Sequence, residues 1–523
     1  MRWSSQCSVL PAAVIIALVL VWSLWPPPRV LPPLELPHDR VPGVWTDETF
    51  ECVGWQAVQG CNGSASAPRD PQKDQACDFP IKAGMAGYCL VRNRTSGQTF
   101  RVMRSGCKSV RPIAEYTCNQ ARQFTDFAHK AATYEPSEQL QLKQDGSRGI
   151  VQSVYEPAIP GVYAIIKLLR QQGCVLPIEL FYMKHEMNLD NPVLKHLLAT
   201  DTSITLREIP LWLDKFATKP YAIFHSAFDQ LLFLDCDNFP TRDPTYLFDH
   251  PAFVSTGAIF WPDYWTPANS MFGMNHQSLL WELFDMPPFG FFEQESGQLL
   301  IDRTKSIDAL TKLAYYNDRI DVWGPLRVLH GDKDLWRLAW HNTSTPYHFV
   351  ETPPAIGGMY DFGVFCGVAM LQHTPLNASD VAFVHANTMK IHGDPAQVPV
   401  WTHVQSFAAD DPRWYVVSNE GEWFFGTPSC WGLNFLAKST VKSIAKTNIG
   451  GSLELDVLKL ARDAGRMMNR PPNPSRVPSM REFLDEWFSL VALVAAIFIV
   501  VAVATVLQQR VLTDGACSIF KQV

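Results

Sequence analysis

The hydrophobic pattern of residues 149–390 alternates between short apolar runs and segments with the 3.6-residue spacing of helices. The apolar runs predict strands at 149–154, 176–183, 204–209, 231–238, 297–303, 368–371 and 381–385. Between them the spacing predicts helices at 160–172, 219–228, 306–316 and 331–340. Strands that alternate with helices in this way predict an α/β fold with a largely parallel sheet.

Two longer apolar runs lie at 9–25 and 488–507. The second has twenty residues without a charge, which is enough to cross a hydrocarbon core of about 30 Å. The first has no small-residue cleavage site after it and two tryptophans near its end, so we predict an uncleaved signal anchor rather than a cleaved signal peptide. The alternative for the second run is a buried core helix, but such helices rarely lack polar residues on every face.

The charges that flank these runs predict how the chain is oriented in the membrane. Arg2 precedes the first run, and Arg510 and Lys521 follow the second, which favours a cytosolic position for both tails, 1–8 and 508–523. The residues between the runs are then expected to be lumenal. Four N-x-S/T sequons fall in that part, at Asn62, Asn93, Asn342 and Asn377.

Cysteine usage also indicates an oxidising compartment. Six of the twelve cysteines are clustered, at positions 52, 61, 77, 89, 107 and 118. An even, dense cluster in a secretory chain predicts disulfides, and its spacing lacks the paired C-x-x-C pattern of zinc sites. We therefore expect a cystine-rich module at 51–122 whose cysteines pair with one another, in a connectivity that the spacing leaves open. We expect this module to orient a catalytic domain or to bind its acceptor.

Composition and the remaining segments complete the predicted layout. The chain has 523 residues, of which 47% are hydrophobic and 18% charged, and its formal net charge is −7. No cluster of Lys and Arg stands out, so no nucleic-acid partner is expected. A proline-rich stem is predicted at 26–50, a linker at 123–147, the α/β domain at 148–445 and a polar spacer at 446–487.

The segment with the most chemical information is LLFLDCDNFP, residues 231–240. Asp235 and Asp237 follow its apolar residues at the end of the predicted strand, and ligands of α/β sheets bind beyond the carboxyl ends of the strands. Two carboxylates there can hold Mn²⁺ or Mg²⁺, which bridges a diphosphate. The alternative is a turn in which the aspartates cap backbone N–H groups. Cys236 is interpreted as a small buried hydrophobe, because the middle side chain points to the opposite side of the strand.

Five segments carry a resemblance to a known family. They are KPYAIFHSAFDQLLFLDCDNFPTRDPTYLFD (219–249), TGAIFWPDYW (256–265), QESGQLLIDR (294–303), GDKDLW (331–336) and FVHANTMK (383–390). In order and spacing they resemble the Golgi α-mannosyltransferases of glycosyltransferase family 71. The resemblance implies a GT-A-like (Rossmann-like) nucleotide-sugar transferase domain, GDP-mannose as donor, Mn²⁺ and retention of the anomeric configuration. The usual family member has one membrane anchor, so a C-terminal span departs from the family.

The resemblance and the residue types together assign candidate roles. His385, at the end of a predicted strand, is expected as a third metal ligand beside the two aspartates. Glu295 resembles the carboxylate that retaining enzymes place near the anomeric carbon. Lys219 and Lys390 are candidates for contacts with the donor phosphates.

Two further aspartates are candidates for catalysis or sugar binding. Asp263 lies between Trp261 and Trp265, and aromatic faces stack on sugar rings. Asp332 belongs to GDKDLW.

Each of these residues also has a structural interpretation. His385 can be a hydrogen-bonded core histidine, the two lysines can be surface residues, and Glu295 can cap a strand. Asp332, together with Asp334, can cap the helix that GDKD opens. Asp263 can belong to buried aromatic packing.

Three functional hypotheses follow. The first is a retaining α-mannosyltransferase that extends a lumenal glycan or glycoprotein in the Golgi membrane, with the endoplasmic reticulum as the alternative compartment. The second is the same fold with a UDP-sugar donor, such as UDP-glucose or UDP-galactose. The third is a non-catalytic, membrane-tethered carbohydrate-binding protein, against which the intact D-x-D argues.

Overall fold

A computed structural model of the chain describes residues 41, 43–63, 67–210, 213, 216–290, 292–361, 363–375, 377, 379–409, 411–419, 429–434 and 437–469. The apolar runs at 9–25 and 488–507, both predicted tails and most of the proline-rich stem lie outside these residues. Within the described part, no helix has the length and apolar character needed to cross a membrane.

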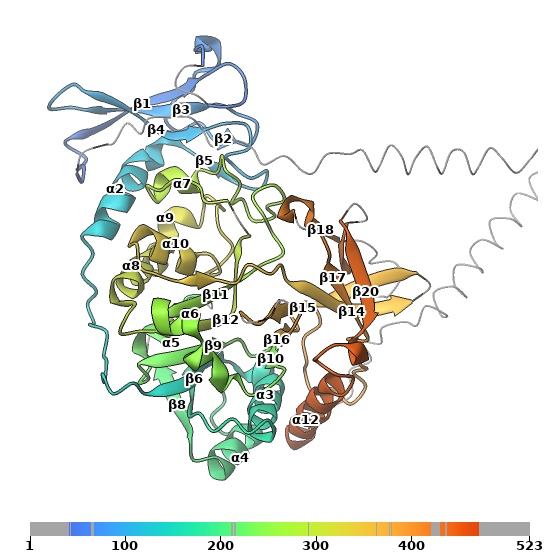
Figure 1. The fold of residues 1–523 in the computed structure, drawn as a ribbon. Helices are drawn as coiled ribbons and strands as arrows, with labels where there is room; N and C mark the ends of the chain where they lie inside the picture. Colours follow the sequence, from blue (N-terminus) through green and yellow to red (C-terminus); the bar gives the residue numbers. More distant parts are fainter. Residues whose placement is uncertain are drawn as a thin grey trace, which may run out of the picture.

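A seven-stranded sheet forms the centre of the molecule (Figure 1), in the order β13-β11-β12-β9-β6-β7-β8. Its strands are β6 Arg148–Val154, β7 Ile178–Met183, β8 Ile204–Ile209, β9 Gln230–Leu234, β11 Ala258–Pro262, β12 Gln294–Asp302 and β13 His348–Phe349. Strands β6 to β9 are parallel to one another, whereas β12 runs antiparallel to both of its neighbours. The α/β class is confirmed.

Helices cover both faces of this sheet, which explains its continuous apolar strands. In β9, Leu232 and Leu234 belong to one core and Leu231 and Phe233 to the core on the opposite face, and all four are fully buried. The first core includes residues of α3 Ile159–Gln171, α4 Pro192–Thr200, α6 Pro251–Thr256 and α12 Leu453–Met467. The second includes residues of α2 Ala121–Ala132, α5 Thr218–His225, α7 Leu280–Leu283, α8 Ile307–Asp318, α9 Ile320–Trp323 and α10 Leu335–Asn342.

A second sheet, antiparallel throughout, lies beside the first (Figure 1). Its strands are β10 Asn238–Pro240, β14 Ala355–Asp361, β15 Val364–His373, β16 Val381–His385, β17 His403–Phe407, β18 Val417–Asn419, β19 Trp431–Leu433 and β20 Ser439–Ser443. The runs at 368–371 and 381–385 were expected to continue the parallel pattern, but they belong to this antiparallel sheet. An apolar run shows that a strand is buried, and it does not show which distant strand it pairs with.

The N-terminal part contains a three-stranded antiparallel sheet of β1 Phe50–Ala57, β3 Gly87–Asn93 and β4 Thr99–Ser105, and a pair of β2 Ile81–Lys82 with β5 Glu115–Tyr116. Disulfides join Cys52 to Cys77, Cys61 to Cys107 and Cys89 to Cys118. The expected disulfide bonds are therefore present, and none joins this segment to the rest of the described chain. A fourth bond, Cys366–Cys430, lies in the second sheet and was not anticipated.

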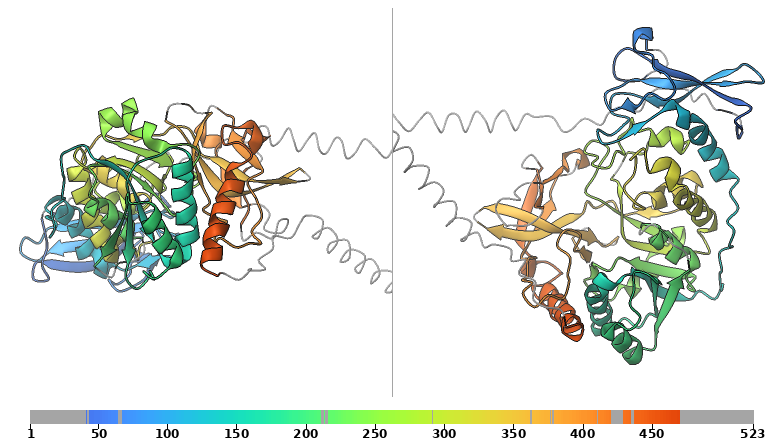
Figure 2. Two further views of the ribbon diagram at one scale, coloured as in Figure 1. Left: turned by 90° about the horizontal axis from the view of Figure 1, so that it is seen from below. Right: turned by 180° about the vertical axis from the view of Figure 1, so that it is seen from behind.

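Two segments that were expected to be irregular contain helices. The predicted linker at 123–147 begins with most of α2, whose Phe124 and Phe127 are buried. The predicted spacer at 446–487 contains α12, which packs against α3 (Figure 2). Both helices are rich in polar residues, so composition indicated connections where helical spacing would have indicated helices. Short 3₁₀ turns occur at Pro71–Lys73, Cys118–Gln120, Glu156–Ala158, Pro244–Asp249, Pro412–Trp414 and Ile444–Lys446.

The loop between β11 and β12 is held against the cystine-rich segment. The backbone N–H of Arg104 donates to the Glu282 carboxylate at 2.9 Å, and the Asn275 amide donates to the Lys108 carbonyl at 3.0 Å. The Ser109 hydroxyl donates to the Gln277 carbonyl. These bonds orient the loop that carries one wall of the cavity described below.

Candidate active site at the junction of the two sheets

The aspartate pair lies where the chain passes from the first sheet to the second. Strand β9 ends at Leu234 and β10 begins at Asn238, so Asp235 and Asp237 occupy the crossover. Strand β10 pairs with β16, and its register places Asn238 opposite His385. Backbone pairing between distant segments therefore brings His385 to the aspartates.

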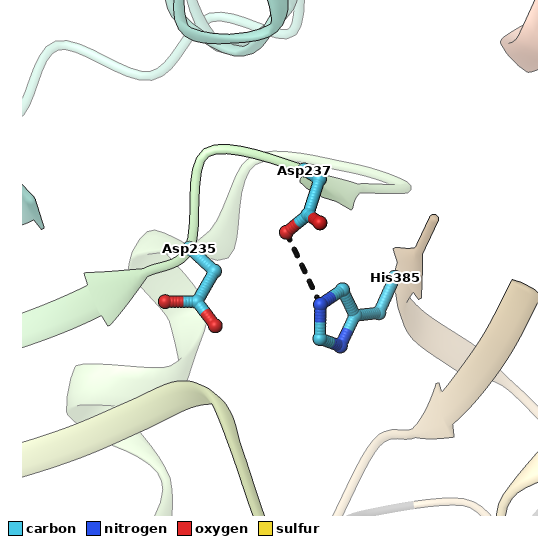
Figure 3. Close-up of side chains that lie close together, drawn as sticks. All are labelled: Asp235, Asp237 and His385. Atoms are coloured by element: carbon cyan, nitrogen blue, oxygen red, sulfur yellow. Dashed lines mark hydrogen bonds and ion pairs between the residues drawn. The ribbon is translucent and has the colours of Figure 1, made fainter. Parts of the chain in front are cut away.

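The side chains of Asp235, Asp237 and His385 converge (Figure 3). Their potential ligand atoms all lie within 4.8 Å of one another, and no other such group of His, Cys, Asp and Glu occurs in the described part of the chain. The His385 Nε2 atom is 3.1 Å from Asp237 Oδ1. The third member of the expected metal set thus lies beside the other two.

Two glycines allow other backbone segments to approach this cluster closely. A Cβ atom on Gly161 of α3 would lie 2.5 Å from the carbonyl oxygen of Cys236. A Cβ atom on Gly297 of β12 would lie 2.7 Å from the ring of His385. Any larger residue at these positions would displace the crossover or the histidine.

Both candidate lysines contact the aspartate pair. The Lys219 Nζ is 3.1 Å from Asp235 Oδ1 and donates to the carbonyl of Ser296 at 2.7 Å. Lys219 is buried, so it is not a surface lysine. Lys390 pairs with Asp237, and its side chain is 46% exposed.

The buried charges shift one another's pKa values. Burial raises the pKa of Asp235, and the adjacent Asp237 raises it further, against the opposing effect of Lys219. Burial disfavours the ionised form of Asp237 as well, but His385 and Lys390 outweigh burial and hold the pKa of Asp237 well below its usual range. Burial lowers the pKa of His385, yet the Asp237 charge more than compensates and raises it. Asp237 is therefore a carboxylate at neutral pH.

A cavity of about 640 Å³ opens over the cluster. All eight residues singled out in the sequence line it: Lys219, Asp235, Asp237, Asp263, Glu295, Asp332, His385 and Lys390. Cavities of about 300–1,000 Å³ are typical of small-molecule sites.

Glu295 lies within β12 and is not a cap before a strand. Its Oε1 accepts a hydrogen bond from the Gly297 N–H at 2.7 Å and is 3.6 Å from His385 Nδ1. Burial raises the pKa of Glu295, and His385 opposes that shift. The carboxyl group is thus held beside the metal-ligand cluster in a site where its charge is unfavourable.

The helix-capping interpretation of the GDKD aspartates does not describe their side chains. Asp334 is the N-cap residue of α10, but its carboxylate makes no cap hydrogen bond and instead accepts from the Gln294 N–H at 2.7 Å. Asp332 accepts from the Trp336 indole N–H at 2.9 Å and is 3.5 Å from Lys219 Nζ. Asp332 therefore helps to fix Lys219 in the cavity.

A buried ammonium group, which was not anticipated from the sequence, lies beside Asp263. Lys333 Nζ is 2.9 Å from Asp263 Oδ2 and 2.6 Å from Glu293 Oε2. Burial raises the pKa of Glu293 to about 7. Lys333 stands between two aspartates of GDKDLW, a signal that could have drawn attention to it, whereas nothing in the sequence links it to Glu293.

The sheet order identifies a second feature that was missed. Strand β6 lies between β7 and β9. The chain passes from β6 to β7 on one side of it, and after β8 it returns to form β9 on the other side. This is a topological switch point, where open α/β sheets bind nucleotides. Tyr155, the residue after β6, lines the cavity there and is 42% exposed.

Part of the chain is similar to a described protein family. Residues 147–286 and 289–374 match the family described as "Mannosyltransferase putative". The matched residues cover less than half of the chain, and this region is similar to that mannosyltransferase family. The match includes the aspartate pair, Glu295 and Asp332, and it ends before His385 and Lys390.

Two yeast proteins illustrate the similarity of this chain to known proteins. Alpha-1,2-mannosyltransferase MNN2 of Saccharomyces cerevisiae is 29% identical over 40% of this chain and 42% of its own length. Alpha-1,2-mannosyltransferase MNN5 of the same species is 26% identical over 60% of this chain and 61% of its own length. The chain thus spans less than two thirds of either relative. The crystal structure of the glycosyltransferase GlyE from Streptococcus pneumoniae aligns with 40% of this chain and 46% of its own at 19% identity, with a TM-score of 0.27.

Proposed function

We propose that the chain is a metal-dependent, retaining α-mannosyltransferase that moves mannose from GDP-mannose to a hydroxyl group of a lumenal glycan. The observation that carries the proposal is the cluster of Asp235, Asp237 and His385 in a cavity at the carboxyl edge of the sheet. The names of the yeast relatives support mannose as the transferred sugar. The switch point beside β6 supports a GT-A-like nucleotide-sugar site.

The ligand atoms of the cluster suit Mn²⁺ or Mg²⁺. Two carboxylates and one imidazole supply hard oxygen and nitrogen atoms, which manganese accepts readily. Asp237 is already ionised, so no proton has to leave it when a cation binds. A bound cation would neutralise the charge that develops on the departing nucleoside diphosphate.

The two lysines are suited to the donor phosphates. Lys219 is fixed by Ser296 and Asp332, so its ammonium group is held in one place. Lys390 is half exposed and can turn from Asp237 toward a phosphate oxygen. Two such positive groups at the aspartate pair would bind a diphosphate and stabilise its negative charge during transfer.

In the proposed reaction, the bond between the anomeric carbon of mannose and the β-phosphate oxygen of GDP breaks. The acceptor hydroxyl forms a new bond to that carbon on the same face, and its proton passes to a diphosphate oxygen. Glu295 is proposed to stabilise the positive charge that develops on the sugar ring, as carboxylates do in glycoside hydrolysis. Its buried charge is unfavourable before the reaction and becomes favourable as the cation forms, so the interaction favours the transition state.

We also propose a Golgi membrane location with the catalytic part in the lumen. Four disulfides in the described residues suit an oxidising compartment. Anchoring by 9–25 and 488–507 remains a prediction. Protease treatment of sealed vesicles should remove tags from both termini and spare the centre, and a protected C-terminal tag would contradict this topology.

The proposed function is tested by incubating the purified full-length chain with Mn²⁺ and a panel of sugar nucleotides, with released nucleotide as the readout. GDP release from GDP-mannose that requires Mn²⁺ supports the proposal. If nucleotide is released only from a UDP-sugar, the donor is that UDP-sugar and not GDP-mannose. If no nucleotide is released from any donor, a carbohydrate-binding protein is favoured.

A further inference from the structure

A row of five aromatic rings lines one part of the cavity. Their order is Phe216, His330, Phe272, Trp265 and Trp431, and the centroids of successive rings are 5.8, 4.4, 6.0 and 5.7 Å apart. All five residues border the cavity. We call this row the aromatic wall.

The wall is built from distant parts of the chain. Trp265 and Phe272 come from the loop after β11, Trp431 comes from β19 of the second sheet, and Phe216 precedes α5. The Trp431 indole N–H donates to the Thr388 hydroxyl at 3.1 Å, which fixes the ring beside the segment that follows His385. Phe216 is 42% exposed, and exposed aromatic side chains at the edge of a cavity mark a binding surface.

The polar groups beside the wall indicate the chemistry of its ligand. Lys333 Nζ lies 4.8 Å from the centre of the Phe272 ring, and the carboxylates of Asp263, Glu293 and Asp334 surround that ammonium group at 2.9, 2.6 and 3.1 Å. Carboxylates therefore outnumber the ammonium group, and this part of the cavity is poorly suited to a phosphate. Aromatic faces next to carboxylate and ammonium groups suit a neutral sugar, whose C–H faces stack on rings and whose hydroxyls form hydrogen bonds.

The cavity has a separate place for the nucleoside of the donor. Tyr155 lies at the switch point beside β6, where α/β sheets bind nucleotides. Asp235 and Asp237 follow β9, the neighbouring strand, whereas Asp263 and Trp265 follow β11, which lies beyond β12 from β9. The order of strands therefore places the aspartate pair between the nucleoside side and the Trp265 end of the aromatic wall, whereas Phe216 lies in the connection from β8 to α5.

We propose that the aromatic wall binds the sugar rings of a neutral glycan acceptor, with the Asp263 carboxylate as a hydrogen-bonding partner of its hydroxyls. This inference rests on the proposed transferase function and assigns the acceptor part of the same site.

The test measures binding of two probes to the full-length chain with Mn²⁺, by saturation-transfer NMR, which needs no turnover. The probes are α-mannobiose and GDP. Phe216→Ala and Trp431→Ala should each raise the dissociation constant of the disaccharide about tenfold and leave that of GDP unchanged. Tyr155→Ala should raise the dissociation constant of GDP and leave that of the disaccharide unchanged. Phe216→Tyr should bind the disaccharide like the wild type.

Phe79→Ala is the matched control, because Phe79 is 41% exposed, almost the same as Phe216, and does not border the cavity. Thermal unfolding checks that Trp431→Ala is folded. Phe216 is half exposed, so Phe216→Ala removes a wall ring without removing a side chain from the core. The proposal is overturned if the wild type does not bind α-mannobiose, or if Phe216→Ala binds it as tightly as Phe79→Ala does. It is also overturned if the wall variants weaken GDP binding and leave disaccharide binding unchanged. Failure of the proposed function shows separately, as absent donor turnover in the wild type.

Discussion

Replacing Asp237 by Asn is the sharpest test of the metal site. The change removes one charge and keeps the shape of the side chain, whose Oδ1 lies 3.1 Å from His385 Nε2. An amide oxygen can still accept a hydrogen bond from the histidine, and Lys390 is exposed enough to be hydrated when its partner charge is lost. The fold should therefore be preserved. Asp237→Ala leaves the buried histidine without this partner and should cost about 1–3 kcal/mol of unfolding free energy.

The effect on activity should be much larger than the effect on stability. Loss of a single contact that stabilises transition-state charge costs about 10²–10³ in rate, and weaker metal binding adds to that loss. We therefore expect Asp237→Asn to lower GDP release from GDP-mannose by at least about 10²-fold and to move the Mn²⁺ titration midpoint to higher concentration. Asp235 and His385 remain as ligands, so high Mn²⁺ should restore part of the activity.

The assay follows GDP release over a range of Mn²⁺ concentrations, with thermal unfolding of each variant measured in parallel. Asp249→Asn is the matched control, because Asp249 is an exposed aspartate that pairs with Arg148 and does not border the cavity. Wild-type turnover with an unchanged Mn²⁺ midpoint in Asp237→Asn would refute the metal assignment. Activity that survives EDTA undiminished would refute it as well.

Three further predictions follow from other parts of the structure. Glu295→Gln should lower turnover about 10²-fold while the dissociation constant of GDP stays unchanged. If turnover and GDP affinity fall together, Glu295 belongs to donor binding instead. Burial raises the pKa of Glu454 to about 7. Between about pH 4.5 and 7 the folded protein therefore keeps a proton on Glu454 that the unfolded chain releases. The unfolding free energy should fall by roughly 3 kcal/mol as pH rises from about 4.5 to 7. Denaturant titrations of Glu454→Gln should lack this part of the pH dependence. Peptide mapping without reduction should recover Cys366 linked to Cys430, and a free thiol at either position would contradict the bond.

The sequence predicted five of the seven strands of the first sheet, all but β11 and β13, and much of the candidate site, because these parts leave local signals. A strand covered by helices on both faces is apolar at every position, as residues 231–234 are. Parallel strands end at a common edge of the sheet, so residues that follow different strands lie close together there. This can be predicted without knowing the strand register. Asp235 after β9 and Asp263 after β11 border one cavity for this reason.

The features that the sequence did not reveal depend on long-range pairing. Strand β10 has three residues, and its partner β16 lies more than a hundred residues away in the chain. The salt bridge of Lys333 with Glu293 joins two segments with no shared local pattern. Trp431 reaches the cavity because β19 pairs with β15 at Gly367, a contact that no spacing rule would indicate.

The junction of the two sheets makes the metal cluster depend on strand register. Asp237 reaches the second sheet through β10, and His385 is positioned by the pairing of β10 with β16. A shift of β16 by one residue would turn His385 to the opposite face of its sheet, because side chains alternate along a strand. A Cβ atom at Gly297 of the first sheet would lie 2.7 Å from the ring, so this glycine lets the histidine lie close to the first sheet. His385 ends β16 of the second sheet and borders the same cavity as the aspartate pair, so the second sheet contributes to the candidate site although β16 to β20 lie beyond the residues that match the mannosyltransferase family.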